Sequence, residues 1–267
     1  MMTPDAHRHD RCYASPLNDC STKITGEHYI SAAVLEEFSV DGAIDIGGLA
    51  WLGDSRRELP LQALVANVLC DRHNEQLSGL DSAAGSFVRR NNEVRHVLAT
   101  QKRRMPIADA TFEGNAIERW LLKCLCGIVA SSATDLPVGK GWRPPLGWLE
   151  ILFDRTPMPA PLGLYFVATK RDPSGIVPKF AFSVVSNDDL GPYGITASFA
   201  EKPFILAMMR PQVRAESMLA DAIRRPAEFI ESNGINRTTT RLEWPNDRDQ
   251  FTVQIHHDNP RKKERPR

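Results

Sequence analysis

The sequence has no long hydrophobic run and no apolar segment near its start. Its longest apolar stretches, at residues 121–130 and 162–168, are too short and too interrupted to cross a bilayer. The opening residues MMTPDAHRHDRCY also lack the apolar core of a signal peptide. We therefore expect a cytoplasmic protein with no membrane partner.

The sequence also lacks an excess of charge of either sign. Its 33 basic and 33 acidic residues cancel, which argues against binding to nucleic acid through overall charge. Basic residues gather instead in the segment 86–104 and in the C-terminal PRKKERPR. We expect the first segment to contact nucleic-acid phosphates, with an ordinary solvated surface as the alternative. Its basic side chains are Arg89, Arg90, Arg95, Lys102, Arg103 and Arg104.

Cysteine is scarce, and its number is odd. Five cysteines in a chain without a signal peptide argue against a disulfide framework. Cys12, Cys20 and Cys70 stand in polar, turn-rich sequence near histidines, which is typical of metal ligands. Cys124 and Cys126 belong to an apolar predicted helix, and we expect them to pack in the core.

Composition and hydrophobic periodicity predict an α+β protein. The content of 42% hydrophobic and 25% charged residues is ordinary for a soluble globular chain. The clearest predicted helix spans residues 113–131, where apolar residues recur at i, i+3, i+4 and i+7. Further helices are expected at 31–38, 74–98 and 214–225, and a hairpin is expected within 43–64.

Several short β-like runs follow the long helix, among them LGLYFVAT, KFAFSVVS, YGITASFA and QFTVQIHH. This half of the chain is expected to form one long helix on a mostly antiparallel sheet. The predicted divisions are a disordered tail (1–11), an N-terminal module (12–85), a basic helical connector (86–104), an α+β domain of unassigned role (105–257) and a basic tail (258–267).

A candidate metal site begins with the pair Cys70-x2-His73 at the start of a predicted helix. Two such ligands can hold one tetrahedral Zn²⁺, but a closed structural site needs four. Cys12 and Cys20 are the plausible second pair because they lie upstream in a turn-rich segment, although their x7 spacing is wider than usual. We therefore expect these four residues to bind a structural zinc ion. The alternative is that they are incidental, with Cys70 buried as a core residue.

Polar residues of another kind accompany the two pairs. The dipeptide Glu27-His28 follows the first pair, Asn67 precedes the second, and Asn74 follows it directly. This ordered set resembles the HNH endonucleases, in particular those whose catalytic hairpin and helix are held by a zinc treble clef. The resemblance covers about residues 10–85.

The set departs from the family pattern at four points. The first cysteine pair is spaced x7, and the last zinc ligand is His73 where the family commonly has cysteine. Asn74 stands where the final histidine of the family name is expected. The segment 30–66 is longer than in a minimal module.

The resemblance implies a treble-clef ββα-metal module that hydrolyses phosphodiester bonds in DNA. His28 would be the general base, since an imidazole titrates near neutral pH. Glu27 and Asn74 offer the oxygen ligands that Mg²⁺ or Mn²⁺ prefers, and the resemblance gives Asn67 the role of orienting the His28 ring. Zinc would then hold the frame while the divalent ion acts at the phosphate.

Each of these residues has a structural alternative. Glu27 can be a favourable charge near a helix start, Asn67 and Asn74 can be caps or turn residues, and His28 can be structural. Asp81, two helical turns after Asn74, is expected to be a surface carboxylate rather than part of the site.

Three hypotheses about function follow. The first is the HNH endonuclease acting on DNA, with RNA as the alternative substrate. The second is a catalytically inactive zinc-binding treble-clef protein that binds nucleic acid or a protein partner. The third is a structural protein without metal. The sequence leaves the oligomeric state unknown.

Overall fold

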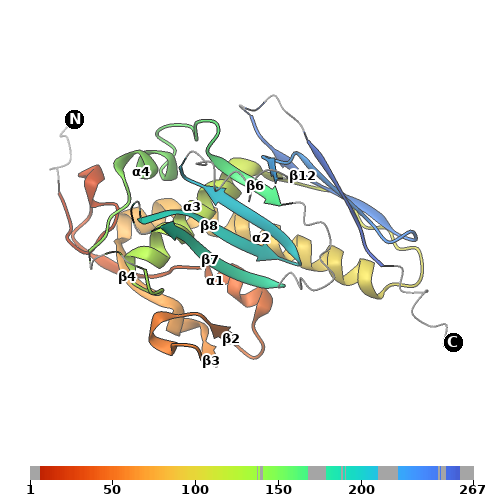
Figure 1. Cartoon of the computed structure of the whole chain (residues 1–267), viewed down its shortest axis with the longest axis horizontal. Coiled ribbons are helices and arrows are strands. Elements are labelled where there is room, and N and C mark those ends of the chain that lie inside the picture. Colours follow the sequence, from red (N-terminus) through yellow and green to blue (C-terminus); the bar gives the residue numbers. More distant parts are fainter. Residues whose placement is uncertain are drawn as a thin grey trace.

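The protein is an α+β chain in which two long helices pack against small strand pairs and two larger sheets (Figure 1). The predicted class is therefore confirmed, as is the mostly antiparallel pairing of the strands. This computed structural model describes residues 7–136, 138, 141–167, 179–187, 189, 191–209, 222–245, 247 and 251–258.

The N-terminal part is built on an antiparallel strand pair, β1 (Ile24–His28) with β4 (Val65–Cys70). The register shifts between Thr25 and Glu27, so Gly26 forms a bulge in β1. The segment between these strands contains the predicted hairpin. Its elements are α1 (Ala32–Leu35), η2 (Glu36–Phe38), β2 (Ala43–Gly47), η3 (Ala50–Leu52), β3 (Arg56–Pro60) and η4 (Leu61–Leu64).

Helix α2 (Asp71–Thr100) begins directly after β4 and runs for 30 residues, which corresponds to about 45 Å. Gly79 and Gly85 do not interrupt it, and the helix extends beyond the predicted 74–98 at both ends. The predicted division at residue 85 falls inside this helix. The N-terminal module and the basic connector therefore share one continuous element.

Helix α3 (Gly114–Ala130) is buried around nearly its whole circumference. The sequence indicated a helix with one apolar stripe, but α3 packs against α2 and also against strands of both larger sheets. Two charged residues, Glu118 and Lys123, are consequently buried on it. The expectation that Cys124 and Cys126 are core residues is confirmed.

The C-terminal part forms two sheets. One is fully antiparallel, in the order β10-β6-β9-β8-β7, and the other is mixed, in the order β13-β11-β12-β5. Their strands are β5 (Ala110–Glu113), β6 (Gly163–Val167), β7 (Phe180–Asn187), β8 (Gly191–Phe199), β9 (Lys202–Ala207), β10 (Ala222–Arg224), β11 (Glu228–Ser232), β12 (Arg237–Glu243) and β13 (Thr252–His256).

Some predicted elements differ in the structure. Most of the helix expected at 214–225 lies outside the described residues, but its last part is strand β10. The expected Pro/Gly-rich loop contains the short helix α4 (Leu146–Leu152). Residues 7–11 are held in place, because the Cys20 N–H donates to the His7 carbonyl. The rest of the disordered tail, and the basic tail beyond Asp258, lie outside the described residues.

The largest cluster of buried apolar side chains includes residues of both halves, from Cys12 in the N-terminal segment to Val253 in β13. The parts of the chain on either side of the predicted divisions at 85 and 104 thus share one core. Among the described residues, no helix combines the length and apolar content needed to cross a membrane.

The two glycines of α2 should respond in opposite ways to substitution by alanine. A Cβ on Gly85 would lie 2.8 Å from the Cβ of Ala33 in α1, whereas a Cβ on Gly79 would meet nothing within 4 Å. We expect Gly85→Ala to lower the free energy of unfolding by about 1–3 kcal/mol through overpacking. Gly79→Ala should raise it by about 0.5–1 kcal/mol, because alanine loses less backbone entropy in a helix.

Urea denaturation of the two variants and the unmodified chain measures both effects. Equal stability of Gly85→Ala and Gly79→Ala would contradict the close packing of α1 on α2.

Candidate metal centre and adjoining pocket

Four buried residues form a compact group of metal-ligating atoms: Cys12, Cys20, Cys70 and His73, hereafter the Cys3His group. Their ligand atoms all lie within 4.8 Å of one another. The Nδ1 atom of His73 is 3.1 Å from the Cys70 sulfur, 3.4 Å from the Cys12 sulfur and 3.8 Å from the Cys20 sulfur. The predicted ligand set is therefore brought together at one point.

This geometry fits a tetrahedral ion. Ligands bound to zinc at its usual Zn–S and Zn–N distances lie about 3.5–3.8 Å from one another. The sulfur–nitrogen distances of the Cys3His group are close to these values, so the group can hold a metal ion such as zinc. The wide x7 spacing is accommodated by η1 (Ser15–Leu17), a turn that folds Cys12 and Cys20 back towards each other.

Hydrogen-bond donors around the thiols act against the effect of burial on their pKa values. Burial raises the pKa of the Cys12 thiol, although the N–H groups of Cys70 and Ala14 oppose the shift by pointing at its sulfur. Burial acts in the same direction on Cys70, but the N–H of His73 and the contacts from Ser21 outweigh it and lower the Cys70 pKa. Cys70 stands at the N-terminus of α2, where negative charge is favoured.

The imidazole of His73 is oriented by an acidic residue, Asp19. Its Nε2 atom lies 2.9 Å from Asp19 Oδ1, and Arg155 donates to the other Asp19 oxygen at 2.7 Å. With its N–H directed at Asp19, the ring keeps the Nδ1 lone pair for the metal. Carboxylate partners of this kind commonly fix the ring orientation of metal-binding histidines.

A pocket of about 470 Å³ adjoins the Cys3His group on the other side of the first turn of α2. We call it the β1–α2 pocket. It contains three of the four predicted catalytic residues, since Glu27, His28 and Asn74 all line it. The remaining lining residues are Thr25, Gly26, Ser31, Ala32, Ala33, Asp71, Glu75, Ser78 and Asp81.

His28 lies at the end of β1 with a half-buried ring. Burial lowers its pKa, partly offset by the main-chain carbonyl of Leu61, which favours the protonated ring. The Nε2 atom is buried, and no described residue hydrogen-bonds to it. Asn67, expected to orient this ring, is exposed on β4 beside Gly26 and is not among the residues that line the pocket.

Glu27 is already paired with a cation. The residue is 6% exposed, and its carboxylate forms an ion pair with the ammonium of Lys123 from α3. Lys123 also donates to Asp81 at 2.6 and 2.7 Å. Asp81 lines the pocket, whereas the sequence indicated a surface carboxylate. Burial opposes the charged form of Lys123, but the two carboxylates outweigh it and raise the Lys123 pKa.

Asn74 faces the pocket, where its side-chain amide donates to Thr25 Oγ1 at 3.2 Å. In the described part of the chain, the Cys3His group is the one place where three or more histidine, cysteine, aspartate or glutamate ligand atoms converge. Glu27 is held by Lys123, and the Asn74 amide is held by Thr25.

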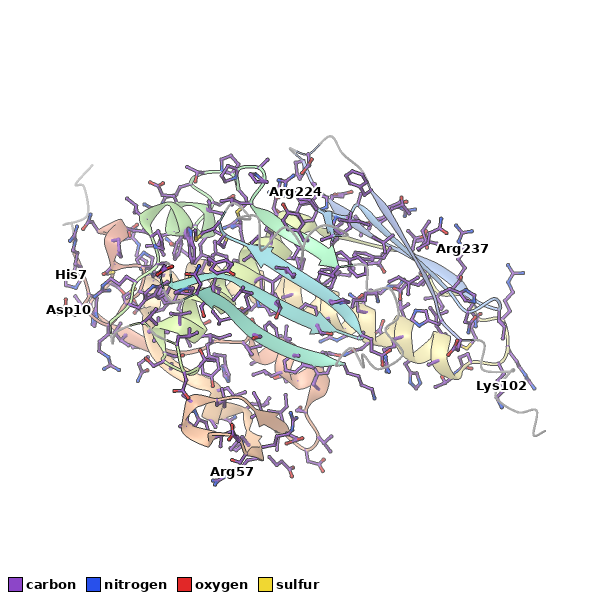
Figure 2. All side chains as sticks on the ribbon, viewed as in Figure 1. His7, Asp10, Arg57, Lys102, Arg224 and Arg237 are labelled. Carbon is purple, nitrogen blue, oxygen red and sulfur yellow. The ribbon has the colours of Figure 1, made fainter. Side chains whose placement is uncertain are left out.

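The predicted nucleic-acid contacts lie along α2 and beyond its end. Arg89 pairs with Glu37 at 2.8 Å, and Arg95 pairs with Glu201. Arg90 donates to the Ala108 carbonyl and to Thr238 Oγ1, both at 2.6 Å. Lys102, Arg103 and Arg104 follow the helix. Lys102 marks the end of the molecule opposite to His7 and Asp10 (Figure 2). A role in binding nucleic acid stays a prediction for all six residues.

Sequence reasoning did not anticipate Lys123, Asp19 or Arg155. The signal for Lys123 was a single lysine within the apolar run WLLKCLCGIV. Asp19 directly precedes Cys20, but nothing in the sequence connects it to His73 or to Arg155.

Comparisons of the chain with protein-family models, with curated proteins and with solved structures found no match.

Substitutions of the cysteines should separate metal ligands from core thiols. We expect one zinc per chain in the purified protein and less than 0.1 zinc, to order of magnitude, in Cys12→Ser, because three remaining ligands leave the tetrahedral site open. Cys126→Ala is the matched control, since this thiol is equally buried but belongs to α3. It should retain the full zinc content.

Elemental analysis of freshly purified proteins measures zinc in each case. An equal zinc content in Cys12→Ser and Cys126→Ala would contradict the assignment of the ligands.

Proposed function

We propose that the chain is an HNH-type endonuclease that hydrolyses phosphodiester bonds in DNA, with a zinc treble clef as its scaffold. One observation carries the proposal: consecutive residues of α2 face two different sites. His73 completes the Cys3His group, while Asn74 lines the pocket that also contains Glu27 and His28. The resemblance expects this of the two positions: a scaffold ligand at His73 and a pocket residue at Asn74.

His28 has the properties of a general base. Its lowered pKa keeps the ring neutral near pH 7, and its Nε2 has no hydrogen-bond partner among the described residues. The ring can therefore accept the proton of a water molecule that attacks the phosphate. The main-chain carbonyl of Leu61, rather than Asn67, supports the protonated ring.

The resemblance also implies a catalytic Mg²⁺ or Mn²⁺ held by Glu27 and Asn74. The residues as placed do not fit such an ion, because Lys123 already neutralises the Glu27 carboxylate.

A second function is favoured by the same ion pair. If the Lys123–Glu27 pair excludes a divalent ion altogether, the chain is a catalytically inactive zinc-binding protein that binds nucleic acid or a protein partner. The basic residues of α2 would serve either function, and RNA is the alternative to DNA in both.

Removing the imidazole of His28 should abolish cleavage. We expect His28→Ala to nick supercoiled plasmid DNA about 10²–10⁴ times more slowly than the unmodified protein in Mg²⁺ or Mn²⁺, which is the usual contribution of a general base. His96→Ala is the control, because His96 is an exposed histidine of α2 outside the pocket. It should cleave at the unmodified rate.

The pH dependence of the cleavage rate tests the same role of His28 in the unmodified protein, without a substitution that could disturb folding. Since burial lowers the pKa of His28, the neutral base persists to lower pH than in an ordinary histidine. The rate should fall on acidification only below the ordinary pKa of about 6.5. Equal cleavage by His28→Ala and the unmodified protein would refute the assignment of the base. No cleavage by the unmodified protein would favour the inactive binding protein.

A further inference from the structure

Lys123 brings a positive charge from α3 to two carboxylates that line the β1–α2 pocket. Its side chain is 4% exposed, and its ammonium contacts carboxylates from two different elements, Glu27 of β1 and Asp81 of α2. It lies outside the segment that resembles the HNH module. A later segment of the chain thus supplies a cation to a pocket whose lining residues lie between Thr25 and Asp81.

The ion pairs belong to a wider network that fixes their geometry. Ser31, at the start of α1, donates its hydroxyl hydrogen to Asp81. The same Ser31 oxygen accepts a hydrogen bond of 2.6 Å from the indole of Trp120, one turn before Lys123 on α3. Trp120 is 1% exposed. Both the ammonium and the hydroxyl that hold Asp81 are therefore positioned by α3.

The charge balance explains why a cation is needed at this point. Two carboxylates that are partly or fully withdrawn from water repel each other and lose hydration, and a cation between them offsets both effects. A protein can supply that cation as an ammonium or as a hard metal ion with oxygen ligands. Lys123 takes this position, so a divalent ion at Glu27 would have to displace the ammonium or approach it closely.

We propose that Lys123 is a built-in cation that occupies a latent divalent-metal site formed by Glu27 and Asp81. The native pocket then binds divalent ions weakly, and removal of the ammonium converts it into a site for one hard divalent cation. The inference rests on the proposed function only for the assignment of Glu27 to the catalytic pocket. For that function, the inference means that the Lys123 ammonium competes with a divalent ion for the Glu27 carboxylate.

Mn²⁺ binding to the zinc-loaded protein tests the proposal directly. Mn²⁺ prefers oxygen ligands and does not compete for the thiolates of the Cys3His group. We expect Lys123→Met to bind one Mn²⁺ at least ten times more tightly than the unmodified protein, as measured by electron paramagnetic resonance and calorimetry. Saturating Mn²⁺ should also raise its melting temperature, because a ligand bound only by the folded state stabilises that state.

Two matched variants separate a latent metal site from an ordinary buried ion pair. Lys202→Met removes another buried lysine, which is paired with Glu231 at 3.0 Å, and should lose stability without gaining Mn²⁺ affinity. The double variant Lys123→Met/Glu27→Gln should lose the Mn²⁺ gained by the single variant. Equal Mn²⁺ affinity in Lys123→Met and the unmodified protein would overturn the proposal.

The folding of the variants and the cleavage of DNA give separate outcomes. If Lys123→Met folds only with Mn²⁺, the ion is replacing the ammonium, which supports the proposal. Lys123→Gln replaces the lysine with a shorter, uncharged polar side chain. If both Lys123→Met and Lys123→Gln stay unfolded at saturating Mn²⁺, the proposal fails. The Mn²⁺ measurements do not use DNA, and plasmid cleavage is measured separately. A gain of Mn²⁺ binding without cleavage would therefore support the latent site and refute the nuclease. Cleavage without a gain of Mn²⁺ binding would support the nuclease and refute the latent site.

Discussion

The convergence of three thiols and one imidazole nitrogen is the constraint on which the rest of the N-terminal structure depends. Cys12 and Cys20 flank η1, Cys70 ends β4, and His73 lies in the first turn of α2. Burial raises the pKa of the Cys12 and Cys20 thiols, so a bound cation would offset the cost of ionising them. Once His73 points at this group, the helical geometry of α2 directs Asn74 towards the β1–α2 pocket.

A second coupling joins the two halves of the chain through α3. This helix is buried nearly all round, and its Lys123 and Trp120 hydrogen-bond to Asp81 and Ser31, which line the pocket. The electrostatics of the pocket consequently depend on α3 as well as on the N-terminal segment. A charge from α3 sets the electrostatic state of Glu27, and the shared core holds that charge in place. This coupling distinguishes the pocket from one assembled by a self-contained ββα module.

The sequence was most informative where chemistry depends on residue type and order. Four metal-ligating residues in turn-rich sequence predicted the Cys3His group, and periodicity predicted α3 and most of α2. Neither signal could reveal Lys123, because its partners Glu27 and Asp81 are 96 and 42 residues away and only tertiary packing brings them together. Strand β10 was missed for a related reason: three residues carry no periodicity, and their pairing with β6 decides their conformation.

Zinc K-edge X-ray absorption on the purified chain is the most direct test of the central constraint. The structure predicts a first shell of three sulfurs at about 2.3 Å and one nitrogen at about 2.0–2.1 Å. That result would establish that the Cys3His group is the metal centre from which α2 and the pocket are organised. A shell of oxygen and nitrogen without sulfur, or the absence of zinc from protein prepared without chelators, would contradict it.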